Sequence, residues 1–463
     1  YTMNPPSVSR SVPVPAAAPR SSALATLLHD AAAGLREIRS GRSGAVALHA
    51  ADARQRPGAQ ALLYHVLRHL GLAEALRAQL APRKPAPAAD ALLCTALALA
   101  AVPQERPYDD FTLVNQAVEA AKSDAATRGQ ASFINACLRR FLREREALMA
   151  QVAGDLLAQW NHPAWWIQRV QKEWPLQWQQ ILCANNVQAP MVLRINKQKS
   201  TPALYIQALE AINIEAFEQK PYAVVLRSAV SVHDLPGFAE GVVSVQDASA
   251  QAAAPLLLGG LPLNQPLRVL DACAAPGGKT AHLLEFAGAD SPMQLTALDV
   301  DPQRCTRIEE TLQRIGLRAQ VLAQDAARPQ DWWQQCCGGE PFDAILLDAP
   351  CTASGIVRRH PDVRWLRRES DIAQLAQVQA RLLAALWPML RPGGRMLYAT
   401  CSVFKAEGQQ QIETFLASNS EASLMPSPGH ILPVAADTGH SVPDNGPGGH
   451  DGFYYALLQK TKR

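Results

Sequence analysis

LRVLDACAAPGGKTAHLLEF, residues 267–286, is the stretch of sequence that decides the fold of the longest part of this chain. Its first residues form a short apolar run rich in branched side chains, which is typical of a buried strand. A glycine-containing turn follows at once, and apolar residues at helical spacing follow the turn. We therefore predict a strand, a tight turn and a helix in direct succession.

The same alternation continues to about residue 401. Four further apolar runs are predicted strands: QLTALDV (294–300), AQVLAQD (319–325), FDAILLDA (342–349) and GRMLYATC (394–401). Helical patterns separate them, such as DPQRCTRIEETLQRIGL and ESDIAQLAQVQARLLAALWPML. This order predicts a parallel sheet with helices on both faces and with ligands bound beyond the carboxyl ends of the strands.

Composition divides the rest of the chain. Residues 1–20 are rich in Pro, Ser and Ala and are expected to form a flexible tail. Residues 21–153 have helical periodicity throughout and predict an all-helical domain. Residues 155–240 open with the tryptophan-rich WNHPAWWIQRVQKEWPLQW, then mix strand-like and helix-like stretches, and predict a small α+β segment. The α/β unit then occupies residues 241–463.

Composition also limits the class of protein. With 48% hydrophobic residues the 463-residue chain can bury large cores, and its net charge of +3 neither requires nor excludes a nucleic-acid partner. The longest apolar run, ALLCTALALAAV (91–102), suits a buried helix and is too short to span a bilayer. The N-terminus has no apolar core of signal-peptide length. We therefore expect a cytoplasmic protein without a membrane partner.

The cysteines indicate a reducing environment. There are nine, an odd number, and no C-x-x-C pair occurs among them. This pattern fits neither a secreted disulfide framework nor a structural zinc site. We expect no bound metal, and we expect the protein to be a monomer.

The turn DACAAPGGKT (271–280) places backbone N–H groups where they can face a ligand. A dinucleotide site would need G-x-G-x-x-G, which is absent. A phosphate-binding P-loop would end in GGKT as this turn does, but Cys273 replaces its first glycine. ILLDA (345–349) also resembles the acidic strand with which such nucleotide hydrolases hold magnesium. A triphosphatase and a purely structural turn therefore remain alternatives to a nucleoside-cofactor site.

Acidic residues follow three of the predicted strands: Asp299, Asp325 and Asp348. A carboxylate some 20 residues beyond a glycine turn can accept hydrogen bonds from both ribose hydroxyls of a nucleoside, which is the role expected for Asp299. Asp325 is then placed to meet the base. Each acid alone is more often a helix N-cap, but three at successive strand ends favour a nucleoside site.

Two cysteines lie at the ends of the fourth and fifth strands, in DAPC (348–351) and ATCS (399–402). A pair of thiols suits methyl transfer to carbon 5 of a cytosine, because a thiolate that adds to carbon 6 makes carbon 5 nucleophilic. Asp348 is the candidate to stabilise charge at ring nitrogen 3, and Lys279 is the candidate to lower the pKa of the attacking thiol. These residues alone do not decide whether Cys351 or Cys401 attacks.

Together, DACAAPGGKT, LDVD, LLDAPCTASGIVRRHPDVRW and YATCSV resemble the motifs of the bacterial Sun/Fmu (RsmB) family of 16S rRNA cytosine-C5 methyltransferases. The resemblance covers nearly the whole chain after the tail. FINACLRRF (133–141) resembles part of the NusB-like RNA-binding domain of that family, and VVSVQDASAQ and DGFYYALL resemble further family segments. The resemblance implies a multidomain protein with an all-α NusB-like RNA-binding domain, a small α+β middle segment and a C-terminal α/β Rossmann-like methyltransferase domain.

The resemblance also implies S-adenosyl-L-methionine as the cofactor and 16S ribosomal RNA as the substrate. The cofactor loop would consist of Cys273, Ala274, Ala275, Pro276, Gly277, Gly278 and Lys279. Asp299, Asp325 and Asp348 would complete the pocket, and Asp348 and Lys279 would also assist catalysis. Cys401 would be the nucleophile, and Cys351 would assist release of the methylated base.

Two groups of arginines are candidate RNA contacts. The segment 352–370 contains Arg358, Arg359, Arg364, Arg367 and Arg368. Because this segment follows Cys351, we expect it to hold phosphates beside the target base. Arg139, Arg140 and Arg143 are expected to form a solvated face of the helical domain. A non-catalytic RNA-binding adaptor remains a third functional class, beside the methyltransferase and the triphosphatase.

Overall fold

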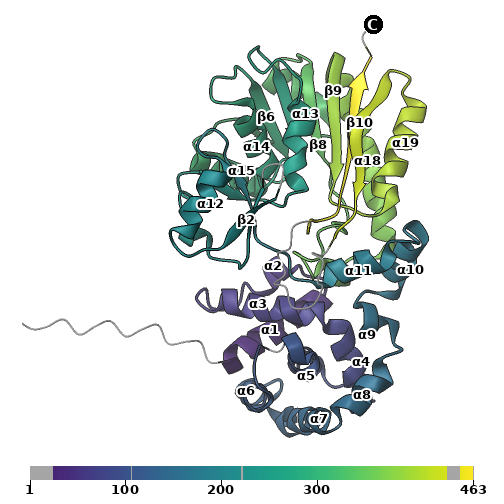
Figure 1. Cartoon of the computed structure of the whole chain (residues 1–463). Helices are drawn as coiled ribbons and strands as arrows, with labels where there is room; N and C mark the ends of the chain where they lie inside the picture. Colours follow the sequence, from purple (N-terminus) through teal and green to yellow (C-terminus); the bar gives the residue numbers. More distant parts are fainter. Residues whose placement is uncertain (1–23, 106, 220–222, 435–448, 462–463) are drawn as a thin grey trace, which may run out of the picture.

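The computed structural model describes residues 24–105, 107–219, 223–434 and 449–461. The tail predicted for residues 1–20 lies outside them. Figure 1 shows a domain of helices at the bottom, a large sheet between helices at the top, and a small sheet beside the large one. Of the helices described, none combines the length and the apolar character needed to cross a membrane.

The N-terminal domain consists of helices, as predicted. They are α1 (Leu24–Arg39), α2 (Gly44–Ala47), α3 (Arg56–Arg68), α4 (Leu70–Leu80), α5 (Pro87–Ala101), α6 (Asp110–Ser123), α7 (Ala131–Arg143) and α8 (Arg145–Val152), with the short 3₁₀ helices η1 (Pro103–Glu105) and η2 (Arg128–Gln130). α5 is buried on all sides, because nearly all of its residues are small or apolar. This confirms the prediction of a core helix at 91–102. Arg139, Arg140 and Arg143 lie on the exposed face of α7.

The middle of the chain contains a small antiparallel sheet in the order β2-β3-β1-β4. Its elements are β1 (Val192–Ile195), α12 (Pro202–Glu210), β2 (Ala216–Gln219), β3 (Ala223–Leu226) and β4 (Val243–Val245). Apolar side chains on one face of the sheet pack against apolar side chains of α12, and together they form the core of this segment. β4 belongs to the small sheet, although the sequence analysis placed its residues in the third domain. A three-residue strand, VSV, does not indicate in the sequence which strand it pairs with.

The C-terminal domain is a seven-stranded sheet in the order β10-β11-β9-β8-β5-β6-β7. The five predicted strands are present and parallel to one another: β5 (Arg268–Ala272), β6 (Gln294–Asp299), β7 (Gln320–Ala323), β8 (Phe342–Asp348) and β9 (Leu390–Thr400). The last two strands, β10 (Ala422–Ile431) and β11 (Phe453–Lys460), run antiparallel to their neighbours. The sheet is therefore mixed rather than wholly parallel.

Helices cover both faces of this sheet, as predicted. They are α13 (Ala253–Leu258), α14 (Gly278–Ala287), α15 (Pro302–Ile315), α16 (Trp333–Cys337), α18 (Glu369–Leu386) and α19 (Gln409–Ser418). The short helix α17 (Val363–Leu366) instead packs against the helical domain. Successive residues of a strand point to opposite faces. Accordingly, Leu397 packs in the core formed with α13 and α14, whereas Tyr398 packs in the core formed with α18 and α19.

Three short helices connect the helical domain to the rest of the chain and carry most of the tryptophan-rich segment: α9 (Leu156–Trp160), α10 (Ala164–Glu173) and α11 (Trp178–Asn186). Trp166, which is fully buried, shares a core with Val357, Val403 and Phe404. The indole of Trp174 donates to the carbonyl of Val403 (2.9 Å). These helices therefore pack beneath the loops that follow β8 and β9.

Candidate active site

The carboxyl ends of β5 and β8 meet where the order of strands reverses. From β5 the chain continues to β6 and β7 on one side, and it then returns to β8 and β9 on the other side. Ligands of α/β sheets bind at such a switch point. A cavity of about 650 Å³ lies there, within the range of about 300–1,000 Å³ that is typical of small-molecule sites.

The loop after β5 leads directly into α14, and the backbone conformation of this loop explains why it contains glycine. Gly277 has a φ of 95°, and a Cβ there would lie 3.0 Å from the Cα of Ile308, so both the conformation and the close approach require glycine. Cys273 has a φ of 61°. Burial raises the pKa of its thiol to about 12, so Cys273 lines the cavity as a neutral side chain.

Asp299 ends β6, Asp325 lies in the loop just after β7, and both line the cavity. Asp299 is almost fully buried, and its carboxylate accepts hydrogen bonds from the N–H groups of Ala275 (3.3 Å) and Asp301 (3.2 Å). Asp325 is exposed, and its carboxylate accepts from the N–H of Ala327 (2.9 Å). The two acids thus line one cavity at the carboxyl ends of neighbouring strands, Asp299 fixed by the loop after β5 and Asp325 open to solvent.

Lys279 and Asp348 form an ion pair at the edge of the cavity, with Nζ 2.7 Å from Oδ2. Burial alone would lower the pKa of Lys279, but the carboxylate of Asp348 raises it above its ordinary value. The ammonium group is therefore retained, and it also interacts electrostatically with Cys401. The side chain of Asp348 is 29% exposed, so it can still contact a ligand in the cavity.

Cys351 and Cys401 come from loops after β8 and β9, which are neighbouring parallel strands. Their Sγ atoms are 3.4 Å apart, and both residues line the cavity. The hydrogen bond to Cys401, together with burial, raises the pKa of Cys351 well above its ordinary value. Cys351 therefore keeps its proton, and it can donate that proton in a hydrogen bond to the sulfur of Cys401.

Glu407 connects the two cysteine loops, and sequence reasoning missed it. Its Oε1 accepts the backbone N–H of Thr352 (2.9 Å), and its Oε2 accepts the hydroxyls of Thr352 (2.5 Å) and Ser402 (2.6 Å). Thr352 and Ser402 each follow a cysteine directly. Glu407 is fully buried and lies in the 3₁₀ helix η7 (Lys405–Glu407). A single Glu within KAEGQQ gives no signal, because its partners lie in other segments.

The basic segment 352–370 differs from the prediction. Arg358 is 1% exposed and pairs with the buried carboxylates of Asp247 and Asp451. Arg359 pairs with the same two acids, so all four charges neutralise one another. A guanidinium that is buried and paired in this way holds the chain together and cannot bind phosphate.

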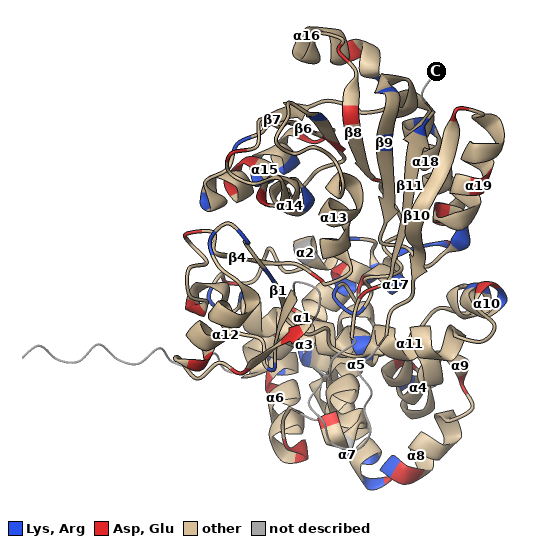
Figure 2. Ribbon diagram, turned by 45° about the horizontal axis from the view of Figure 1, so that its top comes forward, with Lys and Arg blue, Asp and Glu red and all other residues tan. Residues whose placement is uncertain are grey.

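The remaining arginines of this segment divide between structural and exposed positions. Arg364 is fully buried and donates to the carbonyls of Asn161 (3.1 Å) and Asn185 (2.6 Å). Arg367 donates to the carbonyl of Thr352 (3.0 Å), whereas Arg368 is exposed. Figure 2 shows that the chain around α17 lies between the large sheet and the helical domain. Most of the arginines in this segment therefore hold domains together and do not bind RNA.

The structure brings the predicted site residues into one place. Those that line the cavity are Cys273, Ala275, Asp299, Asp325, Asp348, Cys351 and Cys401. Ala274, Pro276, Gly277 and Gly278 complete the turn beside it, and Lys279 reaches Asp348. Arg381 of α18 also lines the cavity and is exposed. Sequence reasoning missed it, because an arginine on the polar side of an amphipathic helix is ordinary.

Three family models match successive parts of the chain. The NusB family matches residues 18–143, a ferredoxin-like domain of RsmF/B-like methyltransferases matches residues 162–233, and the 16S rRNA methyltransferase RsmB/F model matches residues 261–459. The matches follow the same order as the helical domain, the small sheet and the large sheet. They confirm the fold class expected from the resemblance.

Whole-chain comparisons agree with these matches. The ribosomal RNA small subunit methyltransferase B of Klebsiella pneumoniae is 46% identical over 332 residues, which are 71% of this chain and 73% of the relative. The protein of the same name from Vibrio cholerae is 45% identical and covers 75% of this chain and 76% of the relative. The crystal structure of PH0851 superimposes with a TM-score of 0.71 at 25% identity, over 94% of this chain and 99% of that one. This chain belongs to the RsmB/F family of rRNA methyltransferases.

Proposed function

We propose that this protein transfers a methyl group from S-adenosyl-L-methionine to carbon 5 of a cytosine in 16S ribosomal RNA, through a covalent adduct with Cys401. The observation that carries this proposal is the approach of two thiols to 3.4 Å at the wall of the cavity. Methylation of an amine or a hydroxyl needs no thiol, whereas methylation of cytosine carbon 5 needs a nucleophile at carbon 6. The names of the relatives support the choice of rRNA.

The cavity suits S-adenosyl-L-methionine, which supplies an electrophilic methyl group when it is bound. Asp299 is held beside the β5 loop, where its carboxylate can accept from ribose hydroxyls. Asp325 lies at the end of the next strand, where it can meet the adenine. Cys273 and Ala275 of the loop after β5 line the same cavity as these acids and the two thiols.

In the proposed reaction, Cys401 adds to carbon 6 of an unpaired or extruded cytosine. The S–C6 bond forms, and the electron pair of the C5–C6 double bond becomes available at carbon 5 for methyl transfer. The hydrogen bond with Cys351 holds the sulfur of Cys401 at the cavity wall, and the Lys279 ammonium interacts with it electrostatically. Negative charge develops at nitrogen 3 during this addition, and the Asp348–Lys279 pair stabilises it by passing a proton from the pair to nitrogen 3.

Cys351 is proposed to complete the reaction by removing the carbon-5 proton. In the free protein its raised pKa is caused first by the hydrogen bond to Cys401. Once the sulfur of Cys401 is bonded to carbon 6, that cause is removed, and the half-buried Cys351 can lose its proton to water in the cavity and act as a base. Loss of the carbon-5 proton then lets the S–C6 bond break and releases methylated RNA.

A methylation assay with identified products tests the proposed function. The full chain is incubated with 16S rRNA and with cofactor labelled in its methyl group, and 23S rRNA is the control substrate. After nuclease digestion we expect the label in 5-methylcytidine from 16S rRNA alone. Label in an N-methyl or 2′-O-methyl nucleoside, or no label at all, would contradict the proposal.

Glu407→Gln should slow this reaction without weakening cofactor binding. Glu407 fixes both cysteine loops through Thr352 and Ser402, whereas the loop after β5, Asp299 and Asp325 belong to other strands. A misplacement of reacting groups by about 1 Å can cost about 100-fold in rate, so we expect kcat to fall by about that factor. The measurements are kcat, KM for the cofactor and cofactor binding by calorimetry.

The matched control for this variant is Glu413→Gln. Glu413 lies on α19 close in sequence, and its carboxylate accepts from the side chain of Gln409 (2.8 Å) at the exposed surface. We expect this substitution to leave kcat unchanged. A Glu407→Gln protein that loses thermal stability and cofactor affinity in parallel with kcat would show a general structural role instead.

A further inference from the structure

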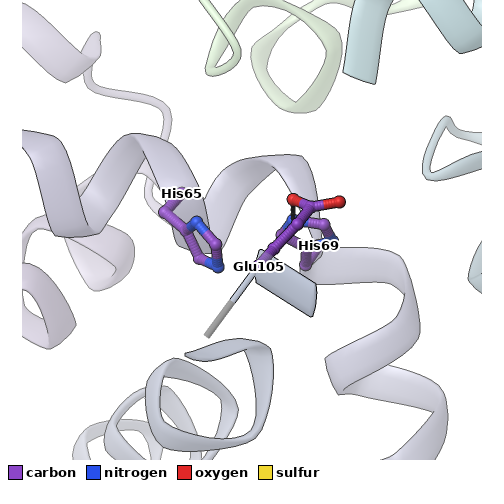
Figure 3. A group of neighbouring side chains, drawn as sticks. All are labelled: His65, His69 and Glu105. Carbon is purple, nitrogen blue, oxygen red and sulfur yellow. Dashed lines mark hydrogen bonds and ion pairs between the residues drawn. The ribbon is translucent and has the colours of Figure 1, made fainter. Parts of the chain in front are cut away.

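Three side chains outside the catalytic cavity gather at one end of the helical domain: His65, His69 and Glu105 (Figure 3). His65 belongs to α3, His69 joins α3 to α4, and Glu105 ends η1, just after the central helix α5. One ligand atom from each residue lies within 4.8 Å of the other two. Neither the predicted catalytic residues nor the proposed reaction uses this cluster.

The arrangement has the features of a site for a borderline transition-metal ion. Residues four apart on a helix project from the same face, and the rings of His65 and His69 accordingly lie 4.7 Å apart between centroids. Glu105 Oε2 lies 3.0 Å from Nε2 of His69. Two imidazoles and one carboxylate are a donor set that zinc accepts, with the fourth position left for water.

The imidazole of His65 is available as a ligand. One of its ring nitrogens lies within 4.8 Å of a ligand atom of His69 and of a ligand atom of Glu105. The ring also forms a hydrogen bond with the backbone of Ala98 in α5. A ligand imidazole in proteins is commonly oriented by such a second hydrogen bond.

An open cavity of about 660 Å³ adjoins the cluster, and all three residues line it. Its opposite wall comes from Asn161 and Asn186, which belong to the connection toward the third domain. The cavity gives an ion an entry path and gives room for a bound water. Arg68 also lines it, and its positive charge opposes a cation, so the site should bind less tightly than a structural zinc site.

The location gives a bound ion a mechanical consequence. Arg68, between the two histidines in sequence, donates to the carbonyl of Arg358 (3.1 Å), in the segment that follows Cys351. An ion held by His65, His69 and Glu105 would tie η1 to the α3–α4 connection, from which this contact extends. It would thus stiffen the helical domain where that domain meets the cysteine loop.

We propose that His65, His69 and Glu105 form a binding site for one Zn²⁺ ion, which clamps η1 to the α3–α4 connection of the helical domain. The proposal does not depend on the proposed methyl transfer. The sequence analysis judged metal binding from the spacing of the cysteines, and this site contains no cysteine. Its ligands are two histidines four residues apart and a glutamate 36 residues beyond the second histidine.

The test measures zinc binding to the full chain after treatment with a chelator. Because two thiols only 3.4 Å apart can also take up added zinc, the titrations use a Cys351→Ser/Cys401→Ser background. Calorimetry should show one zinc equivalent in this background, and saturating Zn²⁺ should raise the Tm. His69→Ala should lose both effects, and Glu105→Gln should weaken binding while leaving the fold intact.

The matched control is His29→Ala in the same background. His29 lies near the carboxylates of Asp30 (3.2 Å) and Asp124 (3.6 Å) on the same domain. That pairing contains a single imidazole, so we expect the control to keep the full zinc equivalent. Equal zinc uptake by His69→Ala, Glu105→Gln and the background protein would overturn the proposal, as would no uptake by the background protein.

Discussion

Cys401→Ala is expected to abolish methyl transfer, with a loss of about 10⁴-fold or more, the order seen when a nucleophile that acts within a catalytic unit is removed. Without the sulfur, carbon 6 has no nucleophile and carbon 5 does not become reactive. The cofactor residues on β5, β6 and β7 are untouched, so cofactor binding should persist. Methyl transfer to 16S rRNA and calorimetric cofactor binding are the two measurements.

A surface cysteine gives the control for this variant. Cys183 on α11 is exposed and is far in sequence from either cysteine loop. Cys183→Ala should transfer methyl groups at the rate of the unaltered protein. If Cys401→Ala remained active while Cys351→Ala lost all transfer, the cysteine of the DAPC motif would be the nucleophile and the proposed roles would be exchanged.

The parallel half of the sheet could be predicted from sequence because local pattern and tertiary position agree there. Each of β5 to β9 is a largely apolar run with a residue of distinct chemistry at its end or in the loop just after it, and parallel strands bring such ends to one edge. Asp348 and Cys401 could therefore be assigned to one site although they are far apart in the chain. The strand pairing, not the spacing of residues, makes them neighbours.

The antiparallel edge could not be predicted in the same way. β10 includes Pro426, Pro428 and Gly429, which are residues that normally interrupt strands. The pairing of β10 with β11 shifts register between Met425 and Gly429, so the strand accommodates them at an irregular edge. The local sequence of β10 therefore does not predict a strand, and pairing with β11 stabilises it in that form.

Buried polar residues escaped prediction for a different reason. Arg358 and Glu407 belong to classes that usually lie at the surface. Each is buried because partners from remote segments neutralise or hydrogen-bond it: Asp247 and Asp451 for the arginine, and Thr352 and Ser402 for the glutamate. The basic segment after Cys351 looked like an RNA contact because its acidic partners cannot be recognised before the fold is known.

Cys351→Ala is expected to convert the protein into a trap for its RNA. Cys401 remains, so addition to carbon 6 and methyl transfer to carbon 5 can both proceed. The base proposed to take the carbon-5 proton is missing, so the S–C6 bond persists after methylation. A protein–RNA adduct that resists denaturant should then accumulate with 16S rRNA and cofactor, and a gel shift under denaturing conditions measures it.

The double variant Cys351→Ala/Cys401→Ala identifies the sulfur that holds the RNA. It should form no adduct, because no thiol remains at the cavity wall to bond carbon 6. Nuclease digestion of the single-variant adduct should leave a methylated cytosine on the peptide that contains Cys401. An adduct that instead accumulates in Cys401→Ala would place the S–C6 bond on Cys351. The two sulfurs are only 3.4 Å apart, so a bond from carbon 6 to either sulfur fits this geometry. The peptide that carries the trapped cytosine therefore decides which cysteine is the nucleophile.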